Sequence, residues 1–252
     1  RRSSDLIAFN QMASRLQTVD STRQRLFRDL AHEIRTPVSV LEAYIEAIED
    51  GVRTLTPETA AMLRDQTRRL VRFSADVAAL AHAEESRFSL SCNMVDVDAV
   101  VRRGIAAVQG RYAAKGVAIR LHPHRALPRV WADEQRLAQV IGNLLDNALM
   151  HTPPGGSVEL TCAHDGAAVT VTVADDGAGI AAEHLPRIFE RLYRADTARD
   201  REHGGAGLGL AIARALVEAQ GGTISVASAG PGRGATFAFG LPVARPRAHI
   251  EA

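Results

Sequence analysis

A histidine with a carboxylate beside it is the first group in this chain that could carry out covalent chemistry. His32 and Glu33 lie in a helical pattern between Leu30 and Ile34, and His32 is placed roughly 200° around the helix from those two apolar side chains. Its neighbours one turn away are polar: Arg28, Asp29, Arg35 and Thr36. An exposed imidazole that a carboxylate holds in one tautomer keeps its other ring nitrogen free as a nucleophile. The alternative is a histidine with a structural role only.

Thr36 lies one helical turn from His32, on the same solvated face. Its hydroxyl is close enough to orient a water molecule next to the histidine. It could also bond back to the carbonyl of residue 32, next to the donor-less Pro37. The sequence leaves both roles open for this hydroxyl.

Two asparagines one turn apart form a second candidate group. Asn143 and Asn147 project from the same face of a helix predicted from Asp133 to Met150. Amide oxygens are hard neutral ligands that suit Mg²⁺, which also keeps phosphate and water in its coordination shell. Two solvated or capping asparagines are the simpler interpretation.

Two glycine clusters follow, and the first, with Gly177-x-Gly179-x-x-Ala182, satisfies the dinucleotide-binding fingerprint by its spacing but not by its context. The chain contains no Gly-x-x-x-x-Gly-Lys-Ser/Thr run. The first cluster, Asp175 to Ile180, follows a predicted strand, but its acids would repel a pyrophosphate and Pro186 interrupts the helix that a dinucleotide fold needs. A carboxylate there is better placed to accept a hydrogen bond from an adenine amino group. The second cluster, Gly204 to Gly209, opens a helix whose backbone N–H groups can approach phosphate oxygens.

Two long amphipathic helices must position His32. Apolar residues three or four apart predict one helix from about Leu16 to Asp50-Gly51, and Thr56-Pro57-Glu58 predicts the start of another that runs to about Ala83. Helices with such apolar stripes cannot bury both faces against each other alone. We therefore expect a homodimeric four-helix bundle, with packing against the rest of the same chain as the alternative.

After residues 84–86 the pattern changes to short strands and helices. Asp165-Gly166 predicts a hairpin turn, and residues 187–207 show no periodicity and predict a loop. The predicted strands are Phe88 to Cys92, Val117 to Leu121, Val158 to Cys162, Val169 to Val173, Ile224 to Val226 and Thr236 to Leu241, and the predicted helices are Val97 to Ala114, Asp133 to Met150 and Leu208 to Ala219.

The composition argues against several classes of protein. The chain has 30 basic and 29 acidic residues, a net charge of +1, so no global field favours a nucleic acid or an anionic membrane, and we expect no nucleic-acid partner. Cys92 and Cys162 occur in unrelated contexts, which excludes a disulfide scaffold and a cysteine-rich zinc site. No apolar run approaches the roughly 20 residues that cross a bilayer.

Taken in order, these residues resemble the transmitter region of bacterial two-component sensor histidine kinases. The resemblance covers almost the whole chain and implies a multidomain α plus α/β fold, in which a dimeric antiparallel four-helix bundle precedes a two-layer α/β ATP-binding sandwich of the gyrase and MutL type. The matching motifs are the phosphoacceptor box His32 to Pro37, the asparagine box Asn143 to Thr152, the first glycine box Asp175 to Gly179, the lid motif Phe189 to Arg194 and the second glycine box Gly205 to Gly209.

The resemblance also implies a role for each matching residue. His32 would accept the phosphoryl group of ATP, with Glu33 assisting the proton transfer. Asn147 would bind Mg²⁺ and Asn143 would support the metal and phosphate site. Asp175 would recognise adenine, and Arg194 would contact phosphate from the lid. Other residues expected at the nucleotide are His151, Gly177, Gly179, Ile180, Arg191, Tyr193, Gly205, Gly207, Leu208 and Gly209.

One position departs from the family pattern. Many relatives carry a basic residue where this chain has Met150, so one charge that would neutralise phosphate is missing. Arg191, Arg194 or His151 would have to compensate.

The implied function is an ATP-dependent kinase that phosphorylates His32 and passes the phosphoryl group to an aspartate of a response-regulator receiver domain, with phosphatase activity on that regulator. The expected domains are the end of a HAMP-like signal-relay helix at 1–17, the dimerisation and phosphotransfer hairpin at 18–85, the ATP-binding domain at 86–243 and a flexible tail at 244–252. A membrane span is expected upstream of this chain, which would be the cytoplasmic portion of a cell-membrane sensor.

Two other functions agree less well with the sequence. A regulatory scaffold that binds nucleotide without catalysis is disfavoured by the intact His32, Glu33, Asn143, Asn147 and Asp175. A serine-directed kinase or ATPase with the same sandwich is disfavoured by the helical pattern around His32.

Overall fold

The computed structural model describes residues 30–31, 34–85, 90–123, 125–191, 193–195 and 207–243. The chain divides into two compact units, Arg1–Ala75 and Asp76–Ala252. Within the described ranges, no helix is both long and apolar enough to span a bilayer.

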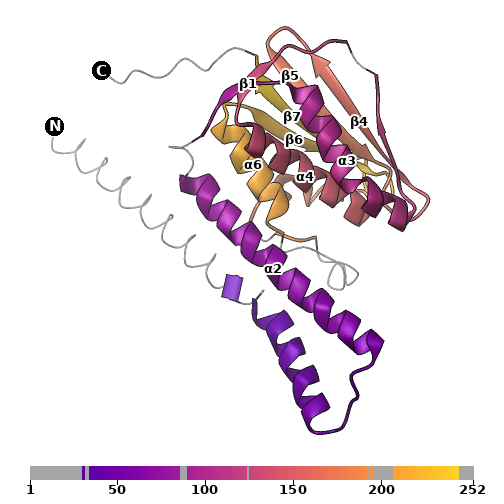
Figure 1. Ribbon diagram of the computed structural model, residues 1–252. Helices are drawn as coiled ribbons and strands as arrows, with labels where there is room; N and C mark the ends of the chain where they lie inside the picture. Colours follow the sequence, from indigo (N-terminus) through magenta and orange to yellow (C-terminus); the bar gives the residue numbers. More distant parts are fainter. Residues whose placement is uncertain are drawn as a thin grey trace, which may run out of the picture. The chain divides into compact units, whose positions relative to one another are not determined.

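The first unit contains two helices joined by a turn, as the sequence predicts. One helix covers residues 34–49 and the other, α2, covers Pro57–Glu85 and continues past the unit boundary (Figure 1). Gly51 ends the first helix with a φ of 70°, and the Thr56 Oγ1 accepts a hydrogen bond of 3.2 Å from the Thr59 N–H at the start of α2. The predicted start of the first helix, near Leu16, lies outside the described residues.

The second unit is built on a five-stranded sheet with the strand order β2-β4-β5-β7-β6. Only the β2 and β4 pair is parallel, and the other neighbours are antiparallel. The strands are β2 Ala118–Leu121, β4 Ser157–His164, β5 Ala168–Asp175, β6 Thr223–Ala227 and β7 Ala235–Pro242. A separate antiparallel pair is formed by β1 Asn93–Val95 and β3 Val130–Ala132.

Three helices cover one face of the large sheet, which gives the two layers of the fold (Figure 1). They are α3 Val97–Lys115, α4 Glu134–His151 and α6 Gly209–Ala219. The core between the layers comes from alternate residues of the central strands, because successive side chains of a strand point to opposite faces. On β5 the buried set is Val169, Val171 and Val173, as the predicted alternation requires.

The predicted strand from Phe88 to Cys92 is wrong in its position. Leu90 to Cys92 lie outside any strand, and the ladder begins where Asn93 pairs with Ala132, while Phe88 lies outside the described residues. The reason is that the Ser91 N–H donates to the Asp133 Oδ2 at 3.0 Å and not to a strand partner. The partner strand β3 has three residues, which is too short for its alternation to be recognised.

Two buried polar side chains join the ends of α4 and α6. Asp133 and Gln220 are 8% and 3% exposed. The Oδ1 of Asp133 caps the first turn of α4, and its N–H donates to the Gln220 Oε1 at 2.9 Å. Gln220 in turn donates from Nε2 to the Leu216 carbonyl at 2.8 Å. Together with the Ser91 bond, this pair ties the chain segment that enters the unit to both helices.

Candidate functional site

The end of β5 places one carboxylate where a ligand could use it. Asp175 is partly buried, and its Oδ1 accepts hydrogen bonds from the Gly177 N–H at 3.0 Å and the Ala235 N–H at 3.3 Å. Burial raises the pKa of the Asp175 carboxyl, and the two backbone bonds act in the opposite direction. Among the residues that the structure describes, no hydrogen bond ends on Oδ2. One carboxylate oxygen is therefore held in place while the other remains able to accept a bond.

The neighbouring carboxylate, that of Asp176, is bonded within the fold. Asp176 accepts from the Ser157 N–H at 2.8 Å and from the Ser157 Oγ at 2.8 Å, and these bonds lower its pKa. Both oxygens of Asp176 are thus engaged at the start of β4. Of the two adjacent acids, the structure leaves Asp175 as the candidate for recognition.

The loop after Asp175 needs glycine because other backbone lies against it. A Cβ at Gly177 would be 2.4 Å from the His151 carbonyl oxygen, at the end of α4. Gly179 has a φ of 68°, and a Cβ there would be 2.1 Å from the Gly230 carbonyl oxygen. The glycines of this cluster therefore allow α4, the loop and the β6–β7 turn to meet in one place.

Ser228 is a site residue that sequence reasoning missed. Its Oγ accepts from the Ile180 N–H at 3.0 Å and donates to the Gly234 carbonyl at 2.6 Å. The Gly232 N–H also donates to the Ala178 carbonyl at 2.6 Å. Residues 228–234 thus back the 177–180 loop, a role that no spacing pattern in the sequence indicates.

The two asparagines on α4 are not equivalent. Asn143 donates from Nδ2 to the Gly209 carbonyl at 2.9 Å, so it fixes the start of α6 against α4. Asn147, one turn later, is half-buried, and within the described part of the chain no hydrogen bond involves its amide. The side-chain oxygen of Asn147 can serve as one hard ligand to a metal ion. The described His, Cys, Asp and Glu side chains form no group of three or more that could hold a metal ion. This fits a cation that takes its other ligands from phosphate and water.

The start of α6 is the third part of the site. Leu208 is fully buried at the N-cap position, and no side-chain hydrogen bond caps this helix in the described residues. By contrast, Asp96 caps α3 and Asp133 caps α4. The first-turn N–H groups of α6 therefore keep the donor capacity that an anion can use. Gly207, Leu208 and Gly209 are the described residues of the second glycine box at this helix start, while Gly205 lies outside the described residues.

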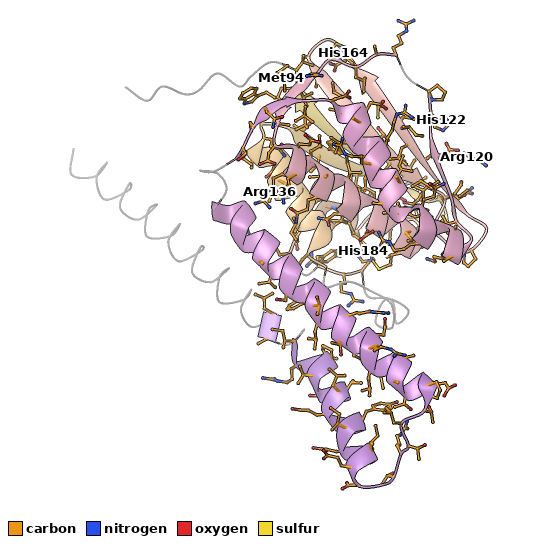
Figure 2. All side chains as sticks on the ribbon, in the orientation of Figure 1. Met94, Arg120, His122, Arg136, His164 and His184 are labelled. Atoms are coloured by element: carbon orange, nitrogen blue, oxygen red, sulfur yellow. The ribbon has the colours of Figure 1, made fainter. Side chains whose placement is uncertain are left out.

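Aromatic contacts anchor the described residues of the predicted lid motif. Phe189 packs edge-on against Phe237, with 6.3 Å between the ring centres. The ring of His184, whose place Figure 2 shows, has its Nδ1 2.7 Å from the Tyr193 hydroxyl. The Arg187 guanidinium lies 4.2 Å from the centre of the Tyr193 ring. These contacts hold Phe189 and Tyr193, the two aromatic residues of the lid motif. Arg191 is exposed and Arg194 is half-exposed.

Comparison with known protein families gives two matches in chain order. Residues 22–86 match the His Kinase A (phospho-acceptor) domain, and residues 132–245 match the histidine kinase-, DNA gyrase B- and HSP90-like ATPase domain. The chain belongs to the two-component histidine kinases, as a transmitter region.

Individual histidine kinases are similar over most of the chain. The signal transduction histidine-protein kinase BaeS of Escherichia coli (strain K12) is 35% identical over 237 residues, which cover 94% of this chain and 50% of BaeS. The chain thus spans about half the length of this relative. The full-length ShkA structure in complex with AMPPNP is 34% identical with a TM-score of 0.63, and the match covers 86% of this chain and 45% of ShkA. Histidine kinase ThkA, solved in complex with response regulator protein TrrA, is 21% identical and shares the fold, with a TM-score of 0.73 over 88% of this chain and 62% of ThkA.

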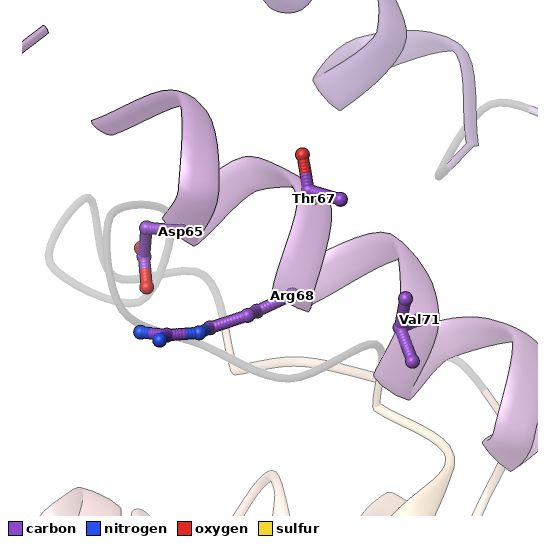
Figure 3. Close-up of a pocket in the computed structure, with 4 residues that line it drawn as sticks. All are labelled: Asp65, Thr67, Arg68 and Val71. Atoms are coloured by element: carbon purple, nitrogen blue, oxygen red, sulfur yellow. The ribbon is translucent and has the colours of Figure 1, made fainter. Parts of the chain in front are cut away.

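In the phospho-acceptor domain of this histidine kinase the structure describes only part of the predicted site. His32 and Glu33 lie outside the described residues, and Thr36 is exposed on the helix of residues 34–49. A hollow of about 450 Å³ lies on α2, lined by Asp65, Thr67, Arg68 and Val71 (Figure 3). None of these four residues belongs to a predicted motif.

The candidate nucleotide site lies in the second unit, at the edge formed by α4, the end of β5 and the start of α6.

Proposed function

We propose that this chain binds ATP, phosphorylates itself on His32 and passes the phosphoryl group to an aspartate of a response-regulator receiver domain. The observation that carries the proposal is the carboxylate of Asp175 at the end of β5, where two backbone N–H groups hold one oxygen and, among the described residues, no hydrogen bond ends on the other. Incubation of the chain with ATP labelled on the γ-phosphate tests the proposal, because only a kinase retains the label.

Each part of the site suits one part of ATP. Adenine presents an exocyclic amino group, and a carboxylate that is partly buried and held by backbone N–H groups is a strong and well-oriented acceptor for it. The phosphates carry the negative charge that helix N-termini favour, and α6 offers such an end next to Asn143. The relative ShkA has been solved with AMPPNP, an ATP analogue, which supports ATP as the ligand.

Mg²⁺ fits the same edge through Asn147. When bound, Mg²⁺ would neutralise phosphate charge. Asn147 would supply one amide oxygen to the ion. Asn143 would keep α4 in the position that presents this oxygen. Arg191, Arg194 and His151 are the remaining groups that could offset the charge that Met150 lacks.

Asn147→Ala should lower the affinity for ATP about tenfold in the presence of Mg²⁺, because it removes a metal ligand. Adenosine, which has no phosphate, should bind the variant as it binds the parent chain. Calorimetric titrations with and without a chelator measure both affinities. An ATP affinity that keeps its full Mg²⁺ dependence in the variant would contradict the assignment.

At His32 the phosphoryl transfer follows from the chemistry of imidazole. A ring nitrogen attacks the γ-phosphorus, the N–P bond forms as the bond to the bridging oxygen breaks, and ADP leaves with the electron pair. Glu33 accepts the proton that the imidazole loses. In the second step the carboxylate oxygen of the regulator's aspartate takes the phosphoryl group, and the histidine nitrogen is released.

The helical unit supports a homodimer through residues 18–85. In the described part of this unit, several apolar side chains of both helices are exposed, among them Ile34 at 45%, Ile45 at 48% and Val71 at 65%. A monomer that leaves such side chains in water gains stability by burying them against a second copy. The proposed product is a four-helix bundle, which fits the match to the phospho-acceptor domain.

We also propose a division of the chain into domains, in line with the matches to the two domain families. Residues 1–17 end a signal-relay helix, 18–85 form the dimerisation and phosphotransfer hairpin, 86–243 form the ATP-binding domain and 244–252 form a tail. The chain is further proposed to be the cytoplasmic portion of a cell-membrane sensor, and the printed name of one relative, Sensor protein SrrB of Staphylococcus aureus, supports the sensing role.

Thr36→Ala should slow dephosphorylation of the regulator while His32 still becomes labelled. The hydroxyl is proposed to orient a water for in-line attack on the aspartyl phosphate, which is a positioning task that the kinase step does not need. The two rates are measured with a purified phosphorylated receiver domain and with labelled ATP. Equal loss of both activities would indicate a damaged helix and would defeat the phosphatase role.

A further inference from the structure

The only lysine of the chain lies where helix α4 ends. Lys115 is the last residue of α3, and its Nζ donates to the Leu149 carbonyl at 2.5 Å and to the Met150 carbonyl at 3.0 Å. We propose that Lys115 is a positioning residue for nucleotide binding, because it fixes the last turn of α4 against the loop that follows Asp175. The proposal rests on the proposed function of that loop as the adenine site.

The sequence after α4 explains why an outside donor is needed. In a helix the carbonyl of residue i accepts from the N–H of residue i+4, so Leu149 and Met150 would need donors at positions 153 and 154. Both positions are proline, which has no N–H. Lys115 supplies hydrogen bonds to the same two carbonyls that Pro153 and Pro154 leave without a helical partner.

The carbonyls on either side of this pair are also satisfied. The Ala148 carbonyl accepts from the Thr152 N–H at 3.0 Å and from the Thr152 Oγ1 at 2.7 Å. The His151 carbonyl accepts from the Ala178 N–H at 3.1 Å. All four carbonyls of the last turn thus have donors, and Lys115 provides for the middle two. Its ammonium also lies at the negative end of the helix dipole, which favours the charge, although burial lowers its pKa.

The contacts that connect Lys115 to the adenine site leave the backbone little room to move. The His151 carbonyl follows directly after the two that Lys115 holds, and it bonds to Ala178. A Cβ on Gly177 would come within 2.4 Å of the same oxygen, so the loop already lies as close as backbone allows. Gly177 in turn donates to the Asp175 Oδ1. A shift of the last turn of α4 would therefore displace the donor that orients the Asp175 carboxylate.

A second contact between α3 and α4 provides a matched control. Arg111, one turn before Lys115, pairs with Asp146 on α4 at 2.7 Å, and both side chains are more than half exposed. This pair bonds side chain to side chain, so it does not touch the carbonyls of the last turn. Exposed ion pairs contribute little to stability.

The test compares three variants of the full chain, Lys115→Met, Lys115→Arg and Arg111→Met. Lys115→Met keeps the length and apolar stem but removes the donors, and it should weaken the binding of ATP and of adenosine alike, each about tenfold. Lys115→Arg keeps donors and charge and should restore most of the affinity. Arg111→Met should bind both ligands within about twofold of the parent. Titrations are made well below the unfolding midpoint of each variant, which is measured by calorimetry.

A purely structural role predicts a different pattern. Lys115→Met would then unfold at a lower temperature but bind adenosine as the parent does, and that result would overturn the proposal. So would equal losses in Lys115→Met and Arg111→Met. If Lys115→Met does not fold, Lys115→Gln replaces it, and hydrogen exchange at the Ala178 amide must be faster than in the parent for the proposal to stand. A parent chain that binds neither ATP nor adenosine would refute the proposed function itself, which is a distinct outcome.

Discussion

Replacing His32 with glutamine is expected to abolish incorporation of label from γ-labelled ATP while leaving the affinity for Mg-ATP unchanged. Glutamine keeps a polar side chain of similar reach but has no nucleophilic nitrogen, so the N–P bond cannot form. The nucleotide motifs lie in the other compact unit of the chain, and they should bind ATP with or without the acceptor. Labelling and equilibrium titration of the same two preparations measure the two properties.

The chemistry of the label provides an independent check on this residue. A phosphoramidate is lost in acid and survives base, whereas a phosphoserine survives acid. His122→Gln is the matched control, since His122 lies between β2 and β3 and bonds to Glu159 at 3.1 Å, outside every motif. The control should label as the parent does. Acid-stable label, or label that persists in His32→Gln, would favour a serine-directed kinase.

Replacing Asp175 with asparagine should reduce the affinity for ATP on the order of 100-fold. The amide oxygen can still accept from Gly177 and Ala235, so the loop keeps its bonds. The Oδ2 position becomes an N–H₂ group, and it then faces the amino group of adenine as donor against donor. The loss comes both from a missing charged hydrogen bond and from two donors left without acceptors.

Two comparisons make the Asp175 result specific. Purine riboside lacks the amino group of adenosine, so the parent chain should prefer adenosine strongly and Asp175→Asn should lose that preference. Asp165→Asn is the matched control, because Asp165 also accepts from two backbone N–H groups, at 2.9 Å each, at the opposite end of the β4–β5 hairpin. If Asp175→Asn still distinguishes the two nucleosides, the adenine assignment is wrong.

Periodicity was sufficient to predict most elements of the second unit. Helix α4 and the β4–β5 hairpin are long enough for several repeats of their patterns, and burial on one face is what produces such repeats. The short strand β3 has no room for a repeat, and the position of β1 depends on the contact between Ser91 and Asp133, which are far apart in sequence. Tertiary contacts of this kind leave no local pattern.

The site shows the same division between local and tertiary signals. Asp175 continues the alternation of Val169, Val171 and Val173 and is the last residue of β5, so the alternation could have distinguished it from Asp176, which follows the strand. Ser228 makes bonds to a loop 48 residues earlier in the chain, and no spacing reveals it. The Pro153-Pro154 pair does indicate that two carbonyls at the end of α4 have no helical N–H donor, but only the fold identifies Lys115 as their donor.

The junction at Ser91, Asp133 and Gln220 defines where this protein can be cut and joined. The ATP-binding domain begins, in practical terms, before its first strand at Asn93. The reason is that the Ser91 N–H already donates a hydrogen bond to the side chain of Asp133, which caps α4. A chimaeric sensor spliced at residue 86 keeps this bond, whereas one spliced at Asn93 replaces the residue that makes it. The boundary for an engineer thus lies in the connecting segment itself, upstream of any strand or helix of the domain.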